Sequence, residues 1–199
     1  MKTLSAGFWN SEELRALGVA RVGENVGISR SCEVIGLENI EVGDNVRIDA
    51  FCAIIATGPV RLGSWIHIGG GCLLSGRGGI TMEDFSGLSG GVMIYSASDD
   101  YTGRHMTNPM VPAEFTGVKV APVRLGRHAI VGAGSVILPG VTLGEGSVLG
   151  ATSLATRPIA PWTIHSGSPA RRIADRARGL LDKEARLLNL TAPASTEAA

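Results

Sequence analysis

The sequence predicts an all-β solenoid, a parallel β-helix, from three observations. Aliphatic residues recur at every sixth position in the second half of the chain. In the first half, similar segments recur at every twentieth position. Glycine is abundant, at 28 of 199 residues, without any low-complexity stretch. Abundant glycine in a regular pattern is typical of a chain that turns many tight corners.

The six-residue repeat begins at Leu125. Its aliphatic position recurs at Val131, Ile137, Leu143, Leu149 and Ala155. Four residues after each of these six positions stands a small or β-branched residue, namely Ala129, Ser135, Val141, Ser147, Ser153 and Ile159. A period of six fits neither an α-helix nor a single long strand. It fits three short strands per triangular coil of about 18 residues, with coils stacked on one another.

The first half repeats the same unit with two extra residues per coil. The segments 40–43, 60–63 and 80–83 are spaced by twenty residues, and so are Cys32, Cys52 and Cys72. We expect the cysteines to form one interior column as small hydrophobic residues. A metal site would need converging ligands, whereas successive coils place side chains in single file about 4.8 Å apart.

The chain divides into four segments by pattern. We expect an N-terminal helical cap over 1–21, a β-helix over 22–168 with an excursion loop at 96–122, a C-terminal helix over 169–190 and a disordered tail over 191–199. Asn10 or Ser11 is the expected N-cap of the first helix. The expected apolar face of the last helix contains Ile173, Ala177, Leu180 and Leu181. Such helices cover the open ends of a solenoid.

Charge and hydropathy exclude several functions. The chain has 18 acidic and 18 basic residues, so it offers no overall electrostatic attraction for nucleic acid or an anionic membrane. No segment approaches the ~20 apolar residues that cross a bilayer. Polar residues interrupt the N-terminus before any signal-peptide core forms. We therefore expect a cytoplasmic protein without a membrane span or a nucleic-acid partner.

These motifs resemble the hexapeptide-repeat acyltransferases, which include galactoside, maltose and xenobiotic acetyltransferases and sugar acetyltransferases of polysaccharide biosynthesis. The resemblance covers roughly residues 22–173. It is most specific over 123–141 and over 166–173, where Gly167-Ser168-Pro169-Ala170-Arg171 is similar to the family's terminal signature. The resemblance implies a left-handed coil, a homotrimer, and acetyl-CoA as cosubstrate in a groove between neighbouring β-helices.

Matching the family's motif positions implies CoA contacts at Ala133, Ala151, Thr156, Arg157 and Arg171. Small residues let the pantetheine arm run along the coil, and guanidinium groups bind phosphates. The alternative is that the alanines are corner residues and the arginines are solvated.

No metal is expected. The carbonic-anhydrase-like branch of the fold needs three histidines around zinc, and no two of the four histidines, His67, His105, His128 and His165, share a twenty-residue column.

The loop departs from the family pattern at its catalytic base. In the related sugar and xenobiotic acetyltransferases, a loop histidine removes a proton from the acceptor hydroxyl. Its position falls near Asp99, and this chain has Ser98-Asp99-Asp100 there, with His105 six residues further on. Either His105 is the base, oriented by Asp99 or Asp100, or a carboxylate takes the proton or orients an amino sugar. The second mechanism favours N-acetylation. A third interpretation is that both aspartates only form a turn and that His105 is exposed and has no role.

The sequence therefore predicts an acetyl-CoA-dependent O- or N-acetyltransferase for a sugar or amino sugar, in surface-polysaccharide biosynthesis. Tyr95, Tyr101 and Asn108 are the candidate sugar-binding residues. The chain shows no N-terminal βαβ unit, so a nucleotide sugar would have to bind on the β-helix itself. The alternatives are a non-catalytic trimeric scaffold and an acetyltransferase for a small molecule other than a sugar.

Overall fold

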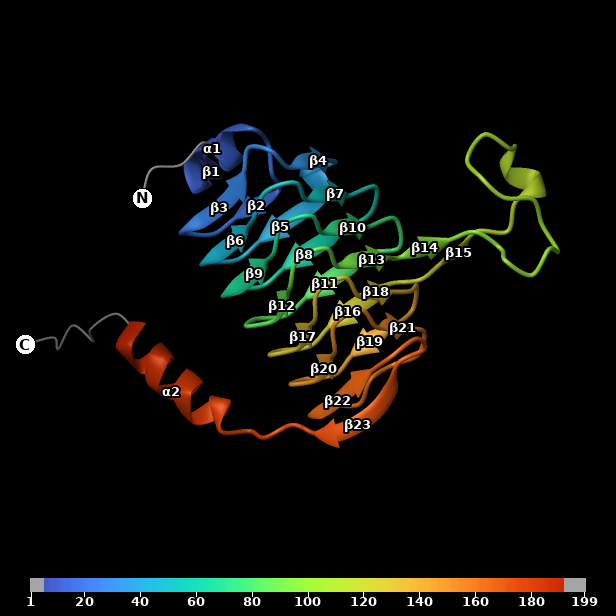
Figure 1. Cartoon of the computed structure of the whole chain (residues 1–199). Coiled ribbons are helices and arrows are strands. Elements are labelled where there is room, and N and C mark those ends of the chain that lie inside the picture. The colour runs from blue at the N-terminus through green and yellow to red at the C-terminus, as the bar shows by residue number, and fades with distance from the viewer. Residues whose placement is uncertain (1–5, 192–199) are drawn as a thin grey trace, which may run out of the picture.

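The computed structural model describes residues 6–191 and shows a parallel β-helix whose three faces are three sheets (Figure 1). Sheet A contains β1 (Phe8–Asn10), β3 (Val26–Ser29), β6 (Val46–Ile48), β9 (Ile66–Ile68), β12 (Gly87–Leu88), β17 (Ile130–Val131), β20 (Val148–Leu149), β22 (Thr163–Ser166) and β23 (Arg171–Asp175). Sheet B contains β2 (Arg21–Val22), β5 (Ile40–Val42), β8 (Val60–Leu62), β11 (Ile80–Met82), β16 (Val123–Leu125) and β19 (Thr142–Leu143). Sheet C contains β4 (Glu33–Ile35), β7 (Ala53–Ile55), β10 (Leu73–Ser75), β13 (Met93–Tyr95), β18 (Val136–Ile137) and β21 (Leu154–Ala155).

The chain visits the sheets in the order B, A, C in every coil, so each coil has a B–A, an A–C and a C–B corner. Strands of consecutive coils pair in parallel, with Ile40 beside Val60 and Val60 beside Ile80. The predicted interior positions are confirmed, because all six repeat residues from Leu125 to Ala155 are at most 1% exposed. Cys52 and Cys72 are also buried, in the predicted column. This narrow interior holds the aliphatic core, and the corners carry the polar groups.

Aromatic rings stack at the B–A corner, where one residue per coil has a positive φ. Asn25, Asn45, Trp65, Phe85, His128, Gly146 and Trp162 occupy this position, with φ between 55° and 63°. The Trp65 and Phe85 rings are 5.9 Å apart and nearly parallel, and the Phe85 and His128 rings are 5.1 Å apart. Stacking therefore compensates the cost of holding bulky residues in the left-handed region.

The predicted excursion loop leaves the C–B corner between β13 and β16. Its two arms pair as β14 (Ala97–Ser98) and β15 (Lys119–Val120), antiparallel, and it contains a 3-10 turn over Ala113–Phe115. A second 3-10 turn, Leu37–Asn39, lies at an earlier C–B corner. The loop extends well away from the coil (Figure 1). Its position is therefore set by a two-stranded stem and not by contact with the core.

The N-terminal helix matches its prediction. Helix α1 (Ser11–Ala16) begins after Asn10, whose side chain accepts a hydrogen bond from the Glu13 amide at 3.0 Å. The Glu13 carboxylate in turn accepts a hydrogen bond from the Asn10 amide, which completes a capping box. Strand β1, which was not predicted, pairs antiparallel with β3 and covers the first edge of sheet A.

The prediction of a helix over 169–190 was wrong in its first half. Residues 171–175 form β23, which pairs antiparallel with β22, and helix α2 spans Leu180–Thr191. The reason is that β22 ends the stack of coils, so its free edge offers hydrogen-bonding groups that the returning chain satisfies. The predicted disordered tail lies outside the described residues, apart from Thr191, which is helical.

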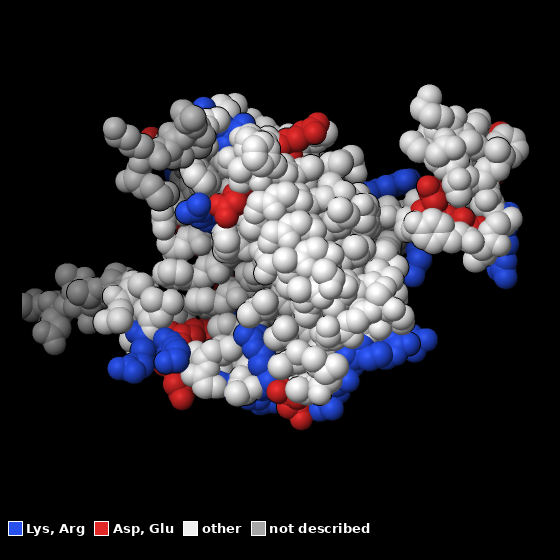
Figure 2. All heavy atoms as spheres, in the orientation of Figure 1, with Lys and Arg blue, Asp and Glu red and all other residues white. Residues whose placement is uncertain are grey.

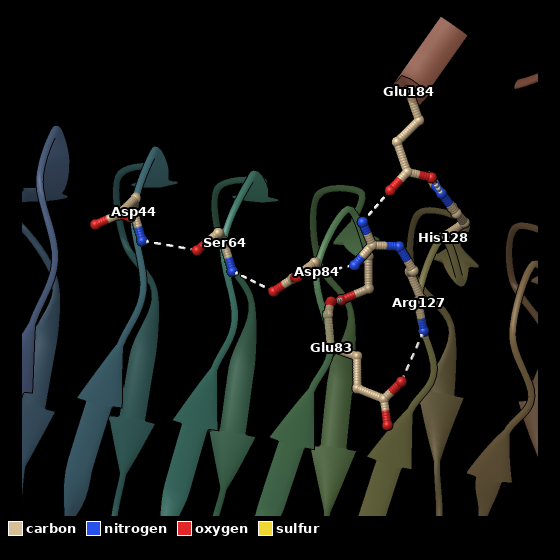
Figure 3. Close-up of polar contacts among 8 residues, drawn as sticks. Asp44, Ser64, Glu83, Asp84, Arg127, His128 and Glu184 are labelled. Carbon is tan, nitrogen blue, oxygen red and sulfur yellow. Dashed lines mark hydrogen bonds and ion pairs between the residues drawn. The ribbon is translucent and has the colours of Figure 1, made fainter. Parts of the chain in front are cut away.

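Helix α2 is tied to the B–A corner by one carboxylate. Glu184 accepts from the Arg127 guanidinium and lies 2.6 Å from Nε2 of His128 (Figure 3). Arg127 also pairs with Asp84 at 2.8 Å, and the Asp84 carboxylate accepts from the Ser64 amide at 2.8 Å. The hydrogen bond from Arg127 lowers the pKa of Glu184, although partial burial raises it.

Acidification should release α2. Docking lowers the pKa of Glu184 below its ordinary value of 4.5. The ionised carboxylate therefore stabilises the docked helix fully above that pH, and the stabilisation is lost as the pH falls through the lowered pKa of the docked state. We expect Glu184→Gln to expose the α2 amides to hydrogen exchange at neutral pH. Glu145→Gln, at the same corner but exposed, is the control. Equal protection in both variants would contradict this role of Glu184.

Candidate active site

A cavity of about 370 Å³ lies at the base of the loop. Asp99 and Asn108 line it together with Ser98 from β14 and Arg77 from the preceding C–B corner. The Asn108 amide donates to Oδ2 of Asp99 at 3.4 Å, and Oδ1 of Asn108 accepts from the Met110 amide at 3.0 Å. The structure therefore brings two predicted site residues together, with a carboxylate and a guanidinium facing one cavity.

Asp100 organises the loop from within. Its carboxylate, only 11% exposed, accepts hydrogen bonds from the amide and hydroxyl of Thr102, both at 2.7 Å, and from the amides of Arg104 and His105, both at 3.1 Å. The bonds from Thr102 hold the pKa of Asp100 well below its ordinary value. A carboxylate held so firmly in its charged form is a poor proton acceptor, so Asp100 fits an orienting group better than a base.

His105 is oriented by Asp100. Its Nδ1 lies 3.1 Å from Oδ2 of Asp100, and its Nε2 has no hydrogen-bond partner among residues 6–191. The ring lies over Gly117, where an added Cβ would come within 2.4 Å of Nδ1. The expected pairing of an aspartate with His105 is thus present in the geometry. The role of His105 as a base stays a prediction.

Tyr95 and Tyr101, the other predicted sugar-binding residues, lie elsewhere in the chain. Tyr95 is on the outer face of β13, with its hydroxyl 3.7 Å from the Met93 sulfur. Tyr101 is 88% exposed in the loop. Neither lines the cavity at Asp99. Within one chain, the structure does not bring them to that site.

A second cavity, of about 250 Å³, lies at the C-terminal end of the coil. It brings together Thr156, Arg157 and Arg171, three of the predicted CoA contacts, and adds Arg172 and His165. No acidic residue lines it. Burial lowers the pKa of His165, with repulsion by Arg172 as a second cause. Its Nε2 is buried without a hydrogen-bond partner among the described residues. Three guanidinium groups around one hollow fit an anion such as a phosphate.

Ala133 and Ala151, the other two predicted CoA contacts, lie at the A–C corner on consecutive coils. Both are exposed, and the Thr152 amide donates to the Ala133 carbonyl at 2.8 Å. This edge is therefore lined by small residues. It does not share a cavity with Arg157 and Arg171 in one chain.

Sequence reasoning missed Arg77, His165 and Arg172. The sequence could have indicated Arg77, because it stands between Gly76 and Gly78 at a corner where the twenty-residue period predicts an outward side chain. Arg172 was missed because the sequence predicted a helix over 169–190, whereas Arg172 lies in β23. Among residues 6–191, no cluster of three or more His, Cys, Asp or Glu side chains is placed to hold a metal ion. No helix in the same range is long and apolar enough to cross a membrane.

The chain is similar to solved acyltransferases over more than nine-tenths of its length. No protein-family model matches it. A variant of AntD, an N-acyltransferase from Bacillus cereus, solved with dTDP and coenzyme A, is 36% identical, covers 93% of this chain and 100% of that one, and superposes with a TM-score of 0.89. AntD with dTDP and 3-hydroxybutyryl-CoA is 37% identical, over 92% of this chain and 97% of that one, with a TM-score of 0.89.

A curated relative from Escherichia coli, dTDP-4-amino-4,6-dideoxy-D-glucose acyltransferase, is 41% identical over 93 residues, which is 47% of this chain and 48% of the relative. The match therefore spans about half the length of that protein. The coiled fold with its long loop is that of an acyltransferase of the β-helix class. The chain belongs to the hexapeptide-repeat acyltransferase family.

Removing the charge of Asp100 should disorder the loop. In Asp100→Asn, the bonds from Thr102, Arg104 and His105 lose their anionic acceptor. We expect hydrogen exchange of residues 101–105 to rise at least ten-fold, while sheets A, B and C keep their protection. Asp99→Asn, which affects one weaker bond at 3.4 Å, is the control. If both variants exchange like the parent protein, Asp100 does not organise the loop.

Proposed function

We propose that this protein is an N-acetyltransferase that transfers the acetyl group of acetyl-CoA to the amino group of a dTDP-linked amino sugar. The observation that carries the proposal is the carboxylate of Asp99 at the loop cavity, where the family's O-acetyltransferases use an imidazole. An amine is a strong nucleophile once neutral, so a carboxylate that receives its proton is sufficient. The similarity, over more than nine-tenths of this chain, to an N-acyltransferase solved with dTDP and coenzyme A or an acyl-CoA supports the same acceptor class.

The reaction needs one proton acceptor and one site for negative charge. The acceptor nitrogen attacks the thioester carbonyl, an N–C bond forms, and the C–S bond breaks. The proton lost by nitrogen passes to Asp99 and from there to the departing CoA sulfur, so the products are an amide and the free thiol. Backbone amides at the coil corners are the available donors for the oxyanion.

The residue spacing supports Asp99 as the base. Solved AntD complexes include variants of one aspartate and variants of a serine ten positions before it. In this chain, Asp99 is the one aspartate preceded by a serine at that distance, and the serine is Ser89. Ser89 is exposed at the A–C corner, directly after β12. Ser89 is therefore our candidate for contact with the acceptor nitrogen.

Ser89 and Asp99 need a second copy of the chain to form one site. Ser89 lies at the A–C corner and Asp99 at the C–B corner, so the width of sheet C separates them in one chain. We propose a homotrimer in which the loop of one copy reaches the A–C corner of the next. The loop supports this, since Tyr101, Met106, Met110 and Phe115 are between 52% and 89% exposed.

The outer face of sheet C supports the same assembly. Its outward residues are almost all apolar, namely Ile35, Ala53, Ile55, Leu73, Met93, Tyr95, Val136 and Leu154. Figure 2 shows a broad stretch of the coil surface without charged side chains. A large apolar surface of this kind marks a contact between proteins. In such a trimer, Ala133 and Ala151 of one copy face Arg157 and Arg171 of the next across the proposed CoA groove.

O-acetylation is the second candidate function. His105, with Nδ1 held by Asp100, has the arrangement in which a carboxylate orients an imidazole for proton abstraction from a hydroxyl. The role in surface-polysaccharide biosynthesis and the cytoplasmic location remain predictions from the sequence.

The base is identified by a pair of substitutions. With dTDP-4-amino-4,6-dideoxyglucose as acceptor and acetyl-CoA as donor, we expect Asp99→Asn to lower kcat by about 10²–10⁴-fold, because the proton has no acceptor. His105→Ala should retain most of the activity. The KM for acetyl-CoA should stay near its original value in both. A reversed pattern would assign the base to His105 and favour O-acetylation.

The arginine cavity should control CoA affinity. We expect Arg171→Glu to weaken CoA binding at least ten-fold by calorimetry, since a carboxylate repels the phosphates that a guanidinium attracts. The affinity of the parent protein should fall as salt rises. Arg124→Glu, on the outer face of sheet B, is the charge-matched control. If both variants bind CoA equally well, the cavity is not the phosphate site.

A further inference from the structure

The cysteine column does more than fill the interior of the coil. Each of the three thiols donates a hydrogen bond to the carbonyl oxygen of the residue that opens the A–C corner of the next coil. The pairs, each 17 residues apart, are Cys32 with Asp49 at 3.0 Å, Cys52 with Gly69 at 3.3 Å and Cys72 with Ser89 at 3.2 Å. The third thiol therefore holds the backbone of the serine that we assign to the acceptor nitrogen.

The chain itself shows which side chains this column accepts. Ser135 lies in the same column and donates to the Gly150 carbonyl, at the start of the next A–C corner, at 2.8 Å. Val92, one coil after Cys72, offers no donor and is 0% exposed. A hydroxyl can therefore replace the thiol as a donor, and a valine side chain can fill the position without one.

The bond from Cys72 orients the peptide group between Ser89 and Gly90. The Ser89 carbonyl points to a thiol that is 1% exposed. Because this peptide is trans, its N–H points in the opposite direction, away from the thiol. The Gly90 amide has no hydrogen-bond partner among residues 6–191, and Gly90 is exposed. An interior bond thus presents a free backbone donor beside the Ser89 side chain.

The glycines of this corner make it dependent on such a bond. Gly90 and Gly91 follow Ser89, and Gly91 has a φ of 71°. Glycine has more accessible backbone conformations than any other residue, so this pair does not fix the direction of the peptide by itself. Among residues 6–191, the Cys72 thiol is the sole donor to the Ser89 carbonyl.

We propose that Cys72 is a positioning residue for the transfer reaction, because its buried thiol fixes the Ser89–Gly90 peptide so that the Ser89 side chain and the Gly90 amide face the substrates together. The thiol acts through the Ser89 carbonyl and touches no substrate. The contact with Cys52 and burial raise the pKa of the Cys72 thiol, so it keeps the proton that it donates. The inference rests on the proposed function, in which Ser89 contacts the acceptor nitrogen.

Three variants test the role of the thiol in turnover. Cys72→Val removes the donor, and Cys72→Ser keeps one. With dTDP-4-amino-4,6-dideoxyglucose and acetyl-CoA, we expect Cys72→Val to lower kcat by about 3–10-fold, the worth of one hydrogen bond, with the KM for acetyl-CoA unchanged. Cys72→Ser should restore most of the parent kcat. Cys52→Val, the matched control, removes the equivalent bond one coil earlier, to Gly69, and should keep the parent kcat.

Amide hydrogen exchange tests the tether without any substrate. The Gly134 amide donates to the Gly90 carbonyl at 3.0 Å, and the Gly91 amide donates to the Gly70 carbonyl at 2.9 Å. Loss of the Cys72 bond should loosen the Ser89–Gly90 segment, so Gly134 should exchange at least three-fold faster in Cys72→Val and at the parent rate in Cys72→Ser. In Cys52→Val, the faster amide should be that of Gly91.

The outcomes separate this inference from the proposed function. If the parent enzyme acetylates this sugar and the two valine variants have equal kcat, the positioning role is wrong and the function stands. Slow turnover in both Cys72 variants would show that the column only packs there, which also overturns the role. If the parent protein does not acetylate this sugar, the proposed function is wrong. Equal Gly134 exchange in all variants would then show that the tether is wrong as well.

Discussion

The structure depends on the hydrogen-bonded register between consecutive coils. Because each strand pairs in parallel with the strand one coil away, residues at equal positions of the repeat form columns that run the length of the molecule. The position of a residue in the repeat then determines its column, and with it whether the side chain is buried, at a corner or on an outer face. Interior columns are aliphatic, one corner stacks aromatic rings and another presents alanine and glycine. A single member of a column can change the local surface, as Gly87 does between His67 and Ile130.

Two adjacent aspartates in the loop have separate tasks because their surroundings differ. Asp100 accepts four local hydrogen bonds, from Thr102, Arg104 and the His105 amide, besides its contact with the His105 ring. These bonds keep its carboxylate charged and order the loop. Asp99 has one long bond from the Asn108 amide and faces a cavity with Arg77. The carboxylate with fewer internal partners is the one available to a substrate. Because Asp100 stays charged and is held in place by the loop, its carboxylate can orient the His105 ring.

Sheet C connects the separate parts of the proposed site. Ser89 and the alanines lie on one edge of this sheet, and Asp99 and Arg157 lie beyond the other. Its apolar outer face would be covered in a trimer, and each edge would then meet the opposite edge of a neighbour. The two corners that flank sheet C point away from each other in one triangular coil. Residues at these two corners can therefore meet only when one copy of the chain packs against another.

The sequence by itself determined the solenoid, its interior columns, the capped N-terminal helix and the loop, because a six-residue period is a local property that survives without any knowledge of contacts. It also identified Thr156, Arg157 and Arg171, which share one cavity. Only the tertiary structure decided that Arg171–Asp175 is a strand, because the free edge of β22 outweighs local helical preference. Only the structure distinguished Asp99 from Asp100 and joined the Cys72 thiol to the Ser89 carbonyl, since hydrogen bonding depends on neighbours that the repeat alone does not specify.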